Sequence, residues 1–240
     1  MAPKFTIVTG GSNGIGAAIT HHLLASGSGV INIDKVPPAK VPDGEYIFFA
    51  ADLSHPVESR QVSAEVMRKY PVEKLVNNAG VSIPGDLEDV TEDDFTNTMN
   101  LHLQAAIIFA QAVTPGMKQR RRGRIVNMSS RAALGKKART VYGGSKAALI
   151  GMTRTWAMEL GAFGITVNAV APGPIVTDLF MRSNSEASVK QLIGSTVVGR
   201  GGTPDDVARA TMFFLSPDSD FITGQVLHVC GGASLGGSPW

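Results

Sequence analysis

The chain has 240 residues, 43% of them hydrophobic and 18% charged, as in an ordinary soluble globular protein with a substantial core. Its formal net charge of +2 excludes a strong overall field, so we expect neither nucleic acid nor a membrane surface as the main partner. The one cysteine, Cys230, excludes a disulfide within the chain and fits a cytoplasmic location. No apolar run approaches the roughly 18 residues that span a bilayer, and no signal peptide precedes the first apolar run.

The first motif is a glycine-rich turn between a strand and a helix. Residues 5–9 form an apolar run typical of a strand, and Ile15, Ile19 and Leu23 then recur at helical spacing. Glycines let the backbone approach a phosphate, and the amides at a helix N-terminus stabilise its charge. We therefore expect a nucleotide-binding turn formed by Gly10, Ser12, Asn13, Gly14, Ile15 and Gly16.

The second predicted strand, residues 30–34, ends in a carboxylate. Asp34 lies 18 residues beyond Gly16, close to the spacing at which an acid accepts hydrogen bonds from an adenosine ribose. The same carboxylate would repel the 2′-phosphate of NADP, so we expect NAD in preference to NADP. Lys35 weakens this inference, because its ammonium lies next to that carboxylate in the sequence.

Strands and helices alternate along the rest of the chain. Strands are expected at residues 46–50, 74–77, 125–128, 165–170 and 225–229, and helices at about 55–70, 91–113, 142–163 and from 203 onward. This alternation predicts a single α/β domain over residues 1–240: a Rossmann-type, doubly wound parallel sheet of about seven strands with helices on both faces. The polar, glycine-punctuated residues 177–202 are expected to form a mobile segment that covers the substrate.

A tyrosine and a lysine four residues apart are the candidate catalytic pair. Tyr142 and Lys146 share one face of the predicted helix, and a neighbouring ammonium favours the phenolate. The pair could therefore act as a general base near neutral pH, although this spacing also arises by chance. The cations before Tyr142 could attract an anionic substrate or simply form a solvated loop; they are Arg131, Lys136, Lys137 and Arg139.

Other clusters indicate structure rather than chemistry. The five histidines show no metal-ligand spacing with one another or with Cys230, so we expect no metal site. Residues 91–94 resemble a helix-capping box. The basic run at residues 118–124 lacks interleaved aromatic residues, so we interpret it as a solvated helix end rather than a nucleic-acid site.

Together the motifs resemble the short-chain dehydrogenase/reductase family over nearly all 240 residues. The glycine turn after Thr9 matches the family's Thr-Gly-x-x-x-Gly-x-Gly motif, and residues 77–80 match its Asn-Asn-Ala-Gly element. The resemblance implies a catalytic tetrad of Asn100, Ser130, Tyr142 and Lys146. It further implies cofactor contacts from Asp52, Leu53, Asn78, Ala79, Gly80, Tyr142, Lys146, Pro172, Ile175 and Thr177.

The chain departs from the family pattern at two places. Cys230 stands where the family's C-terminal element usually has an aspartate, a change expected to affect packing more than chemistry. The catalytic serine is ambiguous, because counting back from Tyr142 selects Ser129 and aligning the preceding strand selects Ser130. We favour Ser130, since loops lose residues more readily than strands shift register.

The resemblance implies an NAD-dependent enzyme that interconverts a secondary alcohol and a ketone. Tyr142 would transfer the proton, Lys146 would hold the ribose and lower the pKa of Tyr142, Ser130 would bind the substrate oxygen, and Asn100 would position a water. An NADPH-dependent 3-oxoacyl (acyl-carrier-protein) reductase and, outside catalysis, a dinucleotide sensor are the alternatives.

The resemblance also implies a homotetramer formed through two helices. Small residues would let these helices approach a partner subunit, although the same residues could instead pack on the sheet. The residues concerned are Ala105, Ala106 and Ala110 on the first helix and Ala147, Ala148 and Gly151 on the second.

Overall fold

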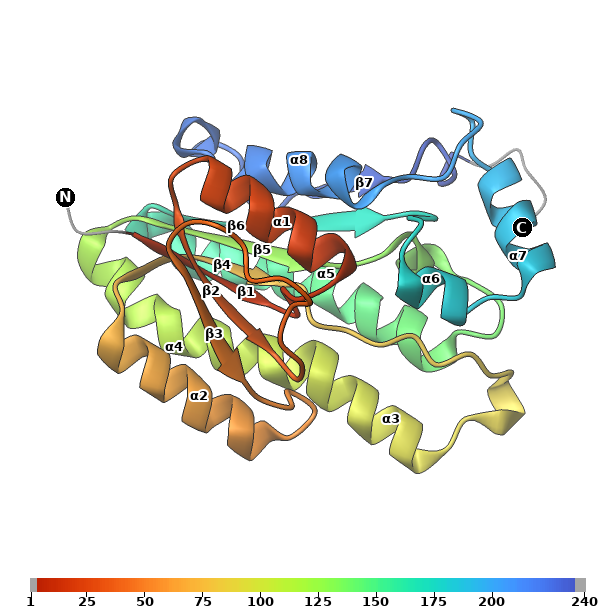
Figure 1. The fold of residues 1–240 in the computed structure, drawn as a ribbon, viewed down its shortest axis with the longest axis horizontal. Coiled ribbons are helices and arrows are strands. Elements are labelled where there is room, and N and C mark those ends of the chain that lie inside the picture. Colours follow the sequence, from red (N-terminus) through yellow and green to blue (C-terminus); the bar gives the residue numbers. More distant parts are fainter. Residues whose placement is uncertain (1–3, 236–240) are drawn as a thin grey trace.

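The computed structural model describes residues 4–235, and their strands form one parallel sheet of seven strands in the order β3-β2-β1-β4-β5-β6-β7 (Figure 1). All six neighbouring pairs are parallel. The strands are β1 Phe5–Thr9, β2 Gly29–Asp34, β3 Tyr46–Ala50, β4 Val72–Asn77, β5 Gly123–Met128, β6 Ile165–Pro172 and β7 Val226–Val229. This order is that of a doubly wound fold whose direction reverses between β1 and β4, so the predicted fold class is confirmed.

Helices cover both faces of the sheet. Figure 1 shows α1 (Gly14–Ala25) and α8 (Pro204–Leu215) on one face, and α2 (Pro56–Lys69) and α4 (Ala105–Arg120) on the other. α5 (Thr140–Leu160) lies on the same face as α4, where the two helices share one apolar cluster. Successive residues of β1 point to opposite faces, so Ile7 belongs to the cluster under α4 and Val8 to the cluster under α1. Two cores therefore hold the sheet rigid at its centre.

The long helix before β5 differs from its predicted form. α3 (Glu92–Met99) passes through a π-helical turn at Asn100–Gln104 into α4, which continues to Arg120 instead of ending near residue 113. The extension is stabilised by Val113 and Met117, which are fully buried. The predicted solvated basic run is also only partly correct: Arg124 is buried and donates to the backbone carbonyls of Ser216 and Pro217.

The small residues proposed for a subunit contact divide into two groups. Ala105, Ala106 and Ala110 are buried within this chain, so they do not support contact with a partner subunit. Ala147 and Gly151 on α5 are exposed. The homotetramer thus stays a prediction, with α5 as the helix that still offers small exposed residues.

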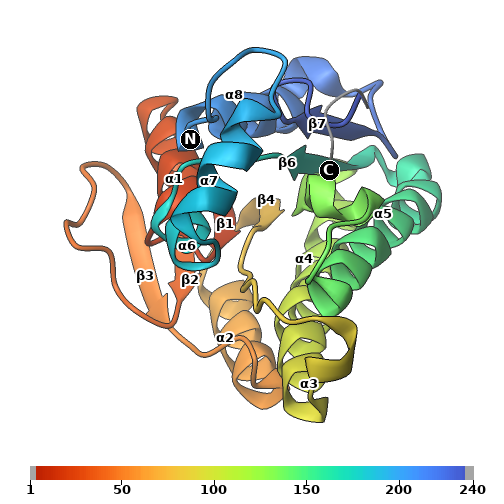
Figure 2. The same cartoon turned by 90° about the vertical axis from the view of Figure 1, so that its right-hand side faces the viewer.

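Residues 177–202 lie at the edge of the sheet where the strands end. They contain α6 (Asp178–Arg182) and α7 (Glu186–Gly194), and Figure 2 shows both helices in front of the strand ends. Thr177 caps α6 by accepting a hydrogen bond from the Phe180 amide at 3.2 Å, and Ser185 caps α7. The predicted covering segment therefore has regular structure of its own. Within residues 4–235, no helix is both long and apolar enough to cross a membrane.

Candidate active site

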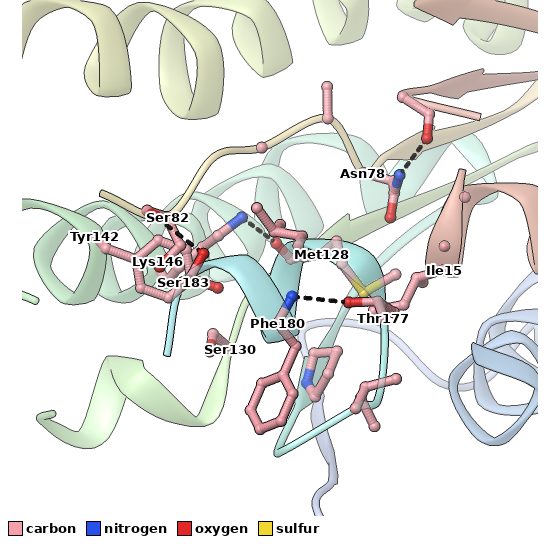
Figure 3. Close-up of a pocket in the computed structure, with 18 of the residues that line it drawn as sticks. Ile15, Asn78, Ser82, Met128, Ser130, Tyr142, Lys146, Thr177, Phe180 and Ser183 are labelled. Atoms are coloured by element: carbon pink, nitrogen blue, oxygen red, sulfur yellow. Dashed lines mark hydrogen bonds between the residues drawn. The ribbon is translucent and has the colours of Figure 1, made fainter. Parts of the chain in front are cut away.

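A cleft of about 450 Å³ opens at the carboxyl ends of the strands, where parallel sheets of this order bind ligands. Every predicted cofactor residue lines this cleft except Ser12. The lining set includes Gly10, Asn13, Gly14, Ile15, Gly16, Asp34, Asp52, Leu53, Asn78, Ala79, Gly80, Tyr142, Lys146, Pro172, Ile175 and Thr177. Segments far apart in the sequence thus meet in one continuous depression, part of which is shown in Figure 3.

The glycine turn forms one wall of the cleft. Gly10 and Gly14 have positive φ angles of 67° and 54°, which favour glycine. A Cβ on Gly16 would lie 2.0 Å from the carbonyl oxygen of Gly10, so no side chain fits there. Asn13 precedes α1 without capping it through its side chain, and the first turn holds no acid. The turn therefore fits the phosphates of a dinucleotide, for which the first amides of α1 are suitable donors.

Asn78 ties the end of β4 to this turn. Its side-chain amide donates to the carbonyl oxygens of Thr9 at 3.0 Å and Gly10 at 2.9 Å, and Figure 3 draws one of these two bonds. The Thr9 hydroxyl in turn accepts hydrogen bonds from the amides of Asn78 and Ala79 at 3.0 and 3.1 Å. These bonds fix the spacing between the glycine turn and the segment that follows β4.

Asp34 lines the end of the cleft at which the adenosine of the cofactor is expected. Its carboxylate accepts from the backbone amides of Ser12 at 3.1 Å and Lys35 at 2.7 Å. The Ser12 hydroxyl is engaged within the chain, because it donates to the Val36 carbonyl and accepts from Asn32, and Ser12 does not line the cleft; its expected cofactor contact stays a prediction. The Lys35 ammonium lies 2.6 Å from the carboxylate of Asp52.

Burial and hydrogen bonding have opposite effects on the pKa of Asp52. Burial alone would raise the pKa of its carboxyl group, but hydrogen bonds from Lys35 and Ser54 outweigh burial and lower that pKa to about 2. Asp52 is therefore ionised at neutral pH. Lys35, which weakened the inference from Asp34, is held toward Asp52.

The candidate catalytic groups gather at the other end of the cleft. Figure 3 shows Ser130, Tyr142 and Lys146 near one another there, and the Ser130 hydroxyl is close enough to act on the phenol, whose pKa it lowers. Ser130 also accepts from the Ala132 amide at 3.1 Å, which orients its hydroxyl. Ser129 is buried and donates to the backbone carbonyl of Lys146 at 2.7 Å. The structure thus places Ser130, and not the Ser129 side chain, beside the tyrosine.

The electrostatics of the pair differ from the expectation. Burial raises the pKa of Tyr142, opposed in part by the hydrogen bond from Ser130 and the charge of Arg139. Burial also lowers the pKa of Lys146 to about 8. The Lys146 ammonium donates to the Met128 carbonyl at 2.9 Å and lies 5.7 Å from the centre of the tyrosine ring. The residues alone therefore hold Tyr142 as a neutral phenol, a form suited to donating a proton to a carbonyl oxygen.

Asn100 is the one predicted catalytic residue that does not line the cleft. It begins the π-helical turn, and its carbonyl oxygen accepts from the Ala105 amide. π-Helical turns often accompany functional sites because they shift the helix that carries them. Its expected role of positioning a water stays a prediction.

His102 is a site residue that sequence reasoning missed. It is only 2% exposed, and its Nε2 accepts from the Val81 amide at 2.9 Å. Nδ1 therefore carries the proton and donates to Ser145 Oγ at 2.8 Å, which donates to the Tyr142 carbonyl at 2.8 Å. Burial and the Lys146 charge lower the pKa of His102, so its ring is neutral. No local sequence pattern indicates this series of hydrogen bonds, since 43 residues separate His102 from Ser145.

Residues beyond Thr177 close the cleft against the opposite wall. Ser183 donates to the Ser82 carbonyl at 3.3 Å (Figure 3), and Arg139 donates to the Ser82 hydroxyl at 3.1 Å. Arg139 also donates to the carbonyl oxygen of Ser183. Other lining residues that the sequence did not single out include Met128, Leu179, Phe180, Asn184, Leu192 and Ser195.

The four cations before Tyr142 do not share one environment. Arg131 and Lys136 line the cleft, whereas Lys137 is exposed and is not a lining residue. Arg139 is buried and donates to neutral oxygens of Ser183 and Asn184 in the covering segment. The interpretation as a purely solvated loop is therefore wrong for Arg131, Lys136 and Arg139. Among residues 4–235, no group of histidine, cysteine, aspartate or glutamate is arranged to hold a metal ion.

Comparison with known proteins agrees with this site. Residues 10–234 match a family profile described as enoyl-(acyl carrier protein) reductase. The chain is 36% identical to the (2S)-[(R)-hydroxy(phenyl)methyl]succinyl-CoA dehydrogenase subunit BbsD of Thauera aromatica, covering 97% of each chain. It is 35% identical to the 3-oxoacyl-[acyl-carrier-protein] reductase FabG of Thermotoga maritima, over 95% of this chain and 97% of that protein.

A solved structure aligns equally well. A protein of Beutenbergia cavernae, provisionally assigned as an NAD(P)-dependent gluconate 5-dehydrogenase and holding NADP at low occupancy, superposes with a TM-score of 0.92. The two chains are 28% identical, and 98% of each is covered. The chain belongs to the short-chain dehydrogenase/reductase family. It is therefore an oxidoreductase of CH–OH and keto groups that uses a nicotinamide dinucleotide.

Proposed function

We propose that this enzyme interconverts a 3-oxoacyl thioester and the corresponding 3-hydroxyacyl thioester. The observation that carries the proposal is the cleft itself, whose lining joins the glycine turn to a neutral Tyr142 and to Ser130. Two relatives that match this chain over nearly its whole length are named for substrates carried as thioesters on coenzyme A or acyl carrier protein. This support favours the 3-oxoacyl reductase alternative over a general alcohol dehydrogenase.

The chain's own residues supply the proton and the orientation. In the reductive direction, Tyr142 donates its phenolic proton to the ketone oxygen while the Ser130 hydroxyl hydrogen-bonds the same oxygen. When bound, a reduced nicotinamide would supply the hydride that, together with the proton from Tyr142, converts the ketone to a secondary alcohol. Lys146 would hold the ribose hydroxyls, and the amides beside Gly14 and Gly16 would hold the phosphates. Thr177 closes over the turn, within ordinary contact distance of a Cβ built on Gly14.

We further propose NAD(H) as the preferred cofactor. Asp34 supports this preference, because its carboxylate lines the adenosine end of the cleft and two backbone amides hold it in place. A 2′-phosphate there would lie beside a fixed negative charge. The relative from Beutenbergia cavernae holds NADP, so the preference needs a direct measurement. Asp34→Ala should narrow the ratio of kcat/KM for NADH over NADPH by about tenfold, the equivalent of one charged hydrogen bond.

Two features support a single domain over residues 1–240. Strands from both ends of the described chain enter one continuous sheet, and the cleft is built from all its parts. We also propose a homotetramer in the cytoplasm, supported by exposed small residues on α5 and by a single cysteine without a disulfide partner.

The test measures the reduction of 3-oxoacyl thioesters by NADH and by NADPH. The reaction is monitored by the decrease in absorbance of the reduced cofactor. Tyr142→Phe should remove nearly all turnover while NADH binding, measured by fluorescence titration, remains within about threefold of wild type. If the protein binds NADH but reduces neither coenzyme A thioesters nor acyl-carrier-protein thioesters, the result would contradict the proposal and favour the sensor alternative. A higher kcat/KM for simple secondary alcohols than for thioesters would contradict the proposed substrate class.

A further inference from the structure

We propose that the substrate end of the cleft binds a carboxylate carried on the acyl chain, with Lys136 as its principal partner. The inference deepens the proposed function by naming a substrate class, a 3-oxoacyl thioester with a second acid group. The feature that carries it is a cationic wall on one side of the cleft, formed by Lys136 and Arg131 with Arg139 behind them.

Lys136 faces the cleft without a carboxylate partner among residues 4–235. Its ammonium hydrogen-bonds a neutral acceptor, the side-chain oxygen of Asn184, at 3.2 Å. No salt bridge of the described residues includes Lys136 or Arg139. Burial, followed by the charges of Arg139 and Arg131, lowers the pKa of Lys136 to about 8. An anion bound here would relieve this repulsion and keep the lysine charged.

The acids of the cleft lie at its other end. Asp34 and Asp52 belong to the adenosine end, where hydrogen bonds from Lys35 engage both carboxylates. Asp178 also lines the cleft, but it directly follows Thr177, which lies against the glycine turn at Gly14. The cleft is therefore divided into an acidic cofactor end and a cationic substrate end. A negative group on the substrate is the complement of that second end.

The position of Lys136 favours an acid on the acyl chain over the phosphates of the thioester carrier. Lys136 and Arg139 both donate to the side-chain oxygen of Asn184, and Arg139 directly precedes α5, the helix that carries Tyr142, so the ammonium lies on the tyrosine side of the cleft. Lys136 thus lies on the wall that faces the reacting carbonyl. The phosphates of a coenzyme A or acyl-carrier arm are separated from that carbonyl by the whole pantetheine chain.

The experiment compares two probes that lack the carrier phosphates. They are the N-acetylcysteamine thioester of 3-oxoadipic acid and its methyl half-ester, which differ only in the distal carboxylate. In wild type, kcat/KM should be at least about tenfold higher for the acid, the size expected of one charge-assisted hydrogen bond. Lys136→Met, nearly equal in length but neutral, should lower this ratio about tenfold. Lys137→Met is the matched control, since Lys137 is exposed outside the cleft, and it should keep the wild-type ratio.

A binding measurement separates this proposal from the proposed function. Each probe is titrated into the enzyme with its oxidised cofactor bound, which cannot reduce a 3-oxoacyl probe, and calorimetry gives the Kd without turnover. Tighter binding of the acid than of the half-ester in wild type, lost in K136M and kept in K137M, supports the carboxylate site whether or not thioesters are reduced. Equal binding of the two probes in wild type, or an unchanged preference in K136M, overturns it.

Two further arms make the result decisive. The coenzyme A thioester of the neutral acyl chain tests whether Lys136 binds the phosphates of the carrier. If K136M weakens the binding of coenzyme A thioesters only, whatever their acyl group, the assignment to an acyl carboxylate is wrong. Lys136→Gln keeps a polar partner for Asn184 and guards against misfolding of K136M. Thermal unfolding of all variants should match wild type within a few degrees. K136Q should lose the same preference; if it keeps that preference, the ammonium charge is not the cause.

Discussion

The buried histidine beneath the active site offers the sharpest test of how the fold positions its chemistry. His102 joins the loop after β4 to α5 through Val81, Ser145 and the carbonyl of Tyr142. We expect His102→Ala to destabilise the protein and slow turnover together, because this substitution breaks that connection at its centre. His102→Gln should restore much of both, since the two ends of a glutamine amide can accept from Val81 and donate to Ser145.

The magnitude follows from the contacts that alanine removes. The Val81 amide loses its side-chain acceptor, and an unmade hydrogen bond of this kind costs about 1 to 3 kcal/mol. The imidazole is also 2% exposed, so its removal leaves a cavity that adds a further loss of about 1 kcal/mol. We therefore expect a loss of about 3 kcal/mol in the free energy of unfolding. Loss of the hydrogen bond that holds Ser145, whose hydroxyl donates to the Tyr142 carbonyl, should let the first turn of α5 shift and lower kcat roughly tenfold. A catalytic group misplaced by about 1 Å can slow a reaction by up to about 100-fold.

The assay combines urea unfolding at pH 7.5 with steady-state kinetics on the same preparations. NADH affinity should change little, because the glycine turn does not depend on His102. A loss in unfolding free energy below about 0.5 kcal/mol, with kcat unchanged, would refute the reasoning. If alanine and glutamine variants are equally impaired, the hydrogen bonds are not what matters, and the shape of the imidazole must be the cause.

Three further outcomes are expected. Ser130→Ala should lower kcat at least about 100-fold, the size of a lost oxyanion donor, and Ser129→Ala should cost less in kcat; the reverse order would show that Ser130 is not the catalytic serine. Gly16→Ala should weaken NADH binding at least tenfold in a fluorescence titration, because its Cβ would lie 2.0 Å from the Gly10 carbonyl oxygen, whereas Gly151→Ala, with open space around it, should not. Light scattering at micromolar concentration should give the mass of a tetramer, and a monomeric mass would contradict the proposed assembly.

The fold could be predicted because its signals are local and repeated. Each strand is an apolar run followed by a helical pattern, and a parallel sheet follows from that alternation. The glycine turn is equally local, since Gly10, Gly14 and Gly16 lie close together in the sequence, and either a positive φ angle or a lack of space disfavours a side chain at each. Helix ends were predicted less well, because burial of Val113 and Met117 extends α4 beyond the point where its pattern fades.

The environment of the site could not be read from the sequence. The raised pKa of Tyr142 depends on burial and not on the spacing to Lys146, whose ammonium donates to the Met128 carbonyl. Ser12 looked like a cofactor contact from its place in the turn, yet its hydroxyl bonds to Val36. The hydrogen bonds through His102 join residues more than 40 positions apart, which only the tertiary structure brings together.

The pH dependence of stability provides a second, independent check on His102. Burial lowers the pKa of this imidazole well below its usual value, while in the unfolded chain the pKa is about 6.5. Below pH 6.5 the unfolded state therefore binds a proton that the folded state does not, so stability falls as the pH decreases. The loss grows by about 1.4 kcal/mol for each pH unit below 6.5, until the folded-state pKa is reached. Above about pH 7.5 the contribution is constant.

The measurement is the difference in unfolding free energy between wild type and His102→Gln from pH 8 to pH 5.5. The other histidines and the carboxylates are present in both proteins, so their titration largely cancels in this difference. The advantage of wild type over the variant should stay level above pH 7.5 and shrink by about 1.4 kcal/mol at pH 5.5. A difference that stays flat over the whole range would mean that the imidazole accepts a proton in the folded protein. The hydrogen bond from Val81 to Nε2 would then be wrongly assigned, because a charged ring donates from both nitrogens.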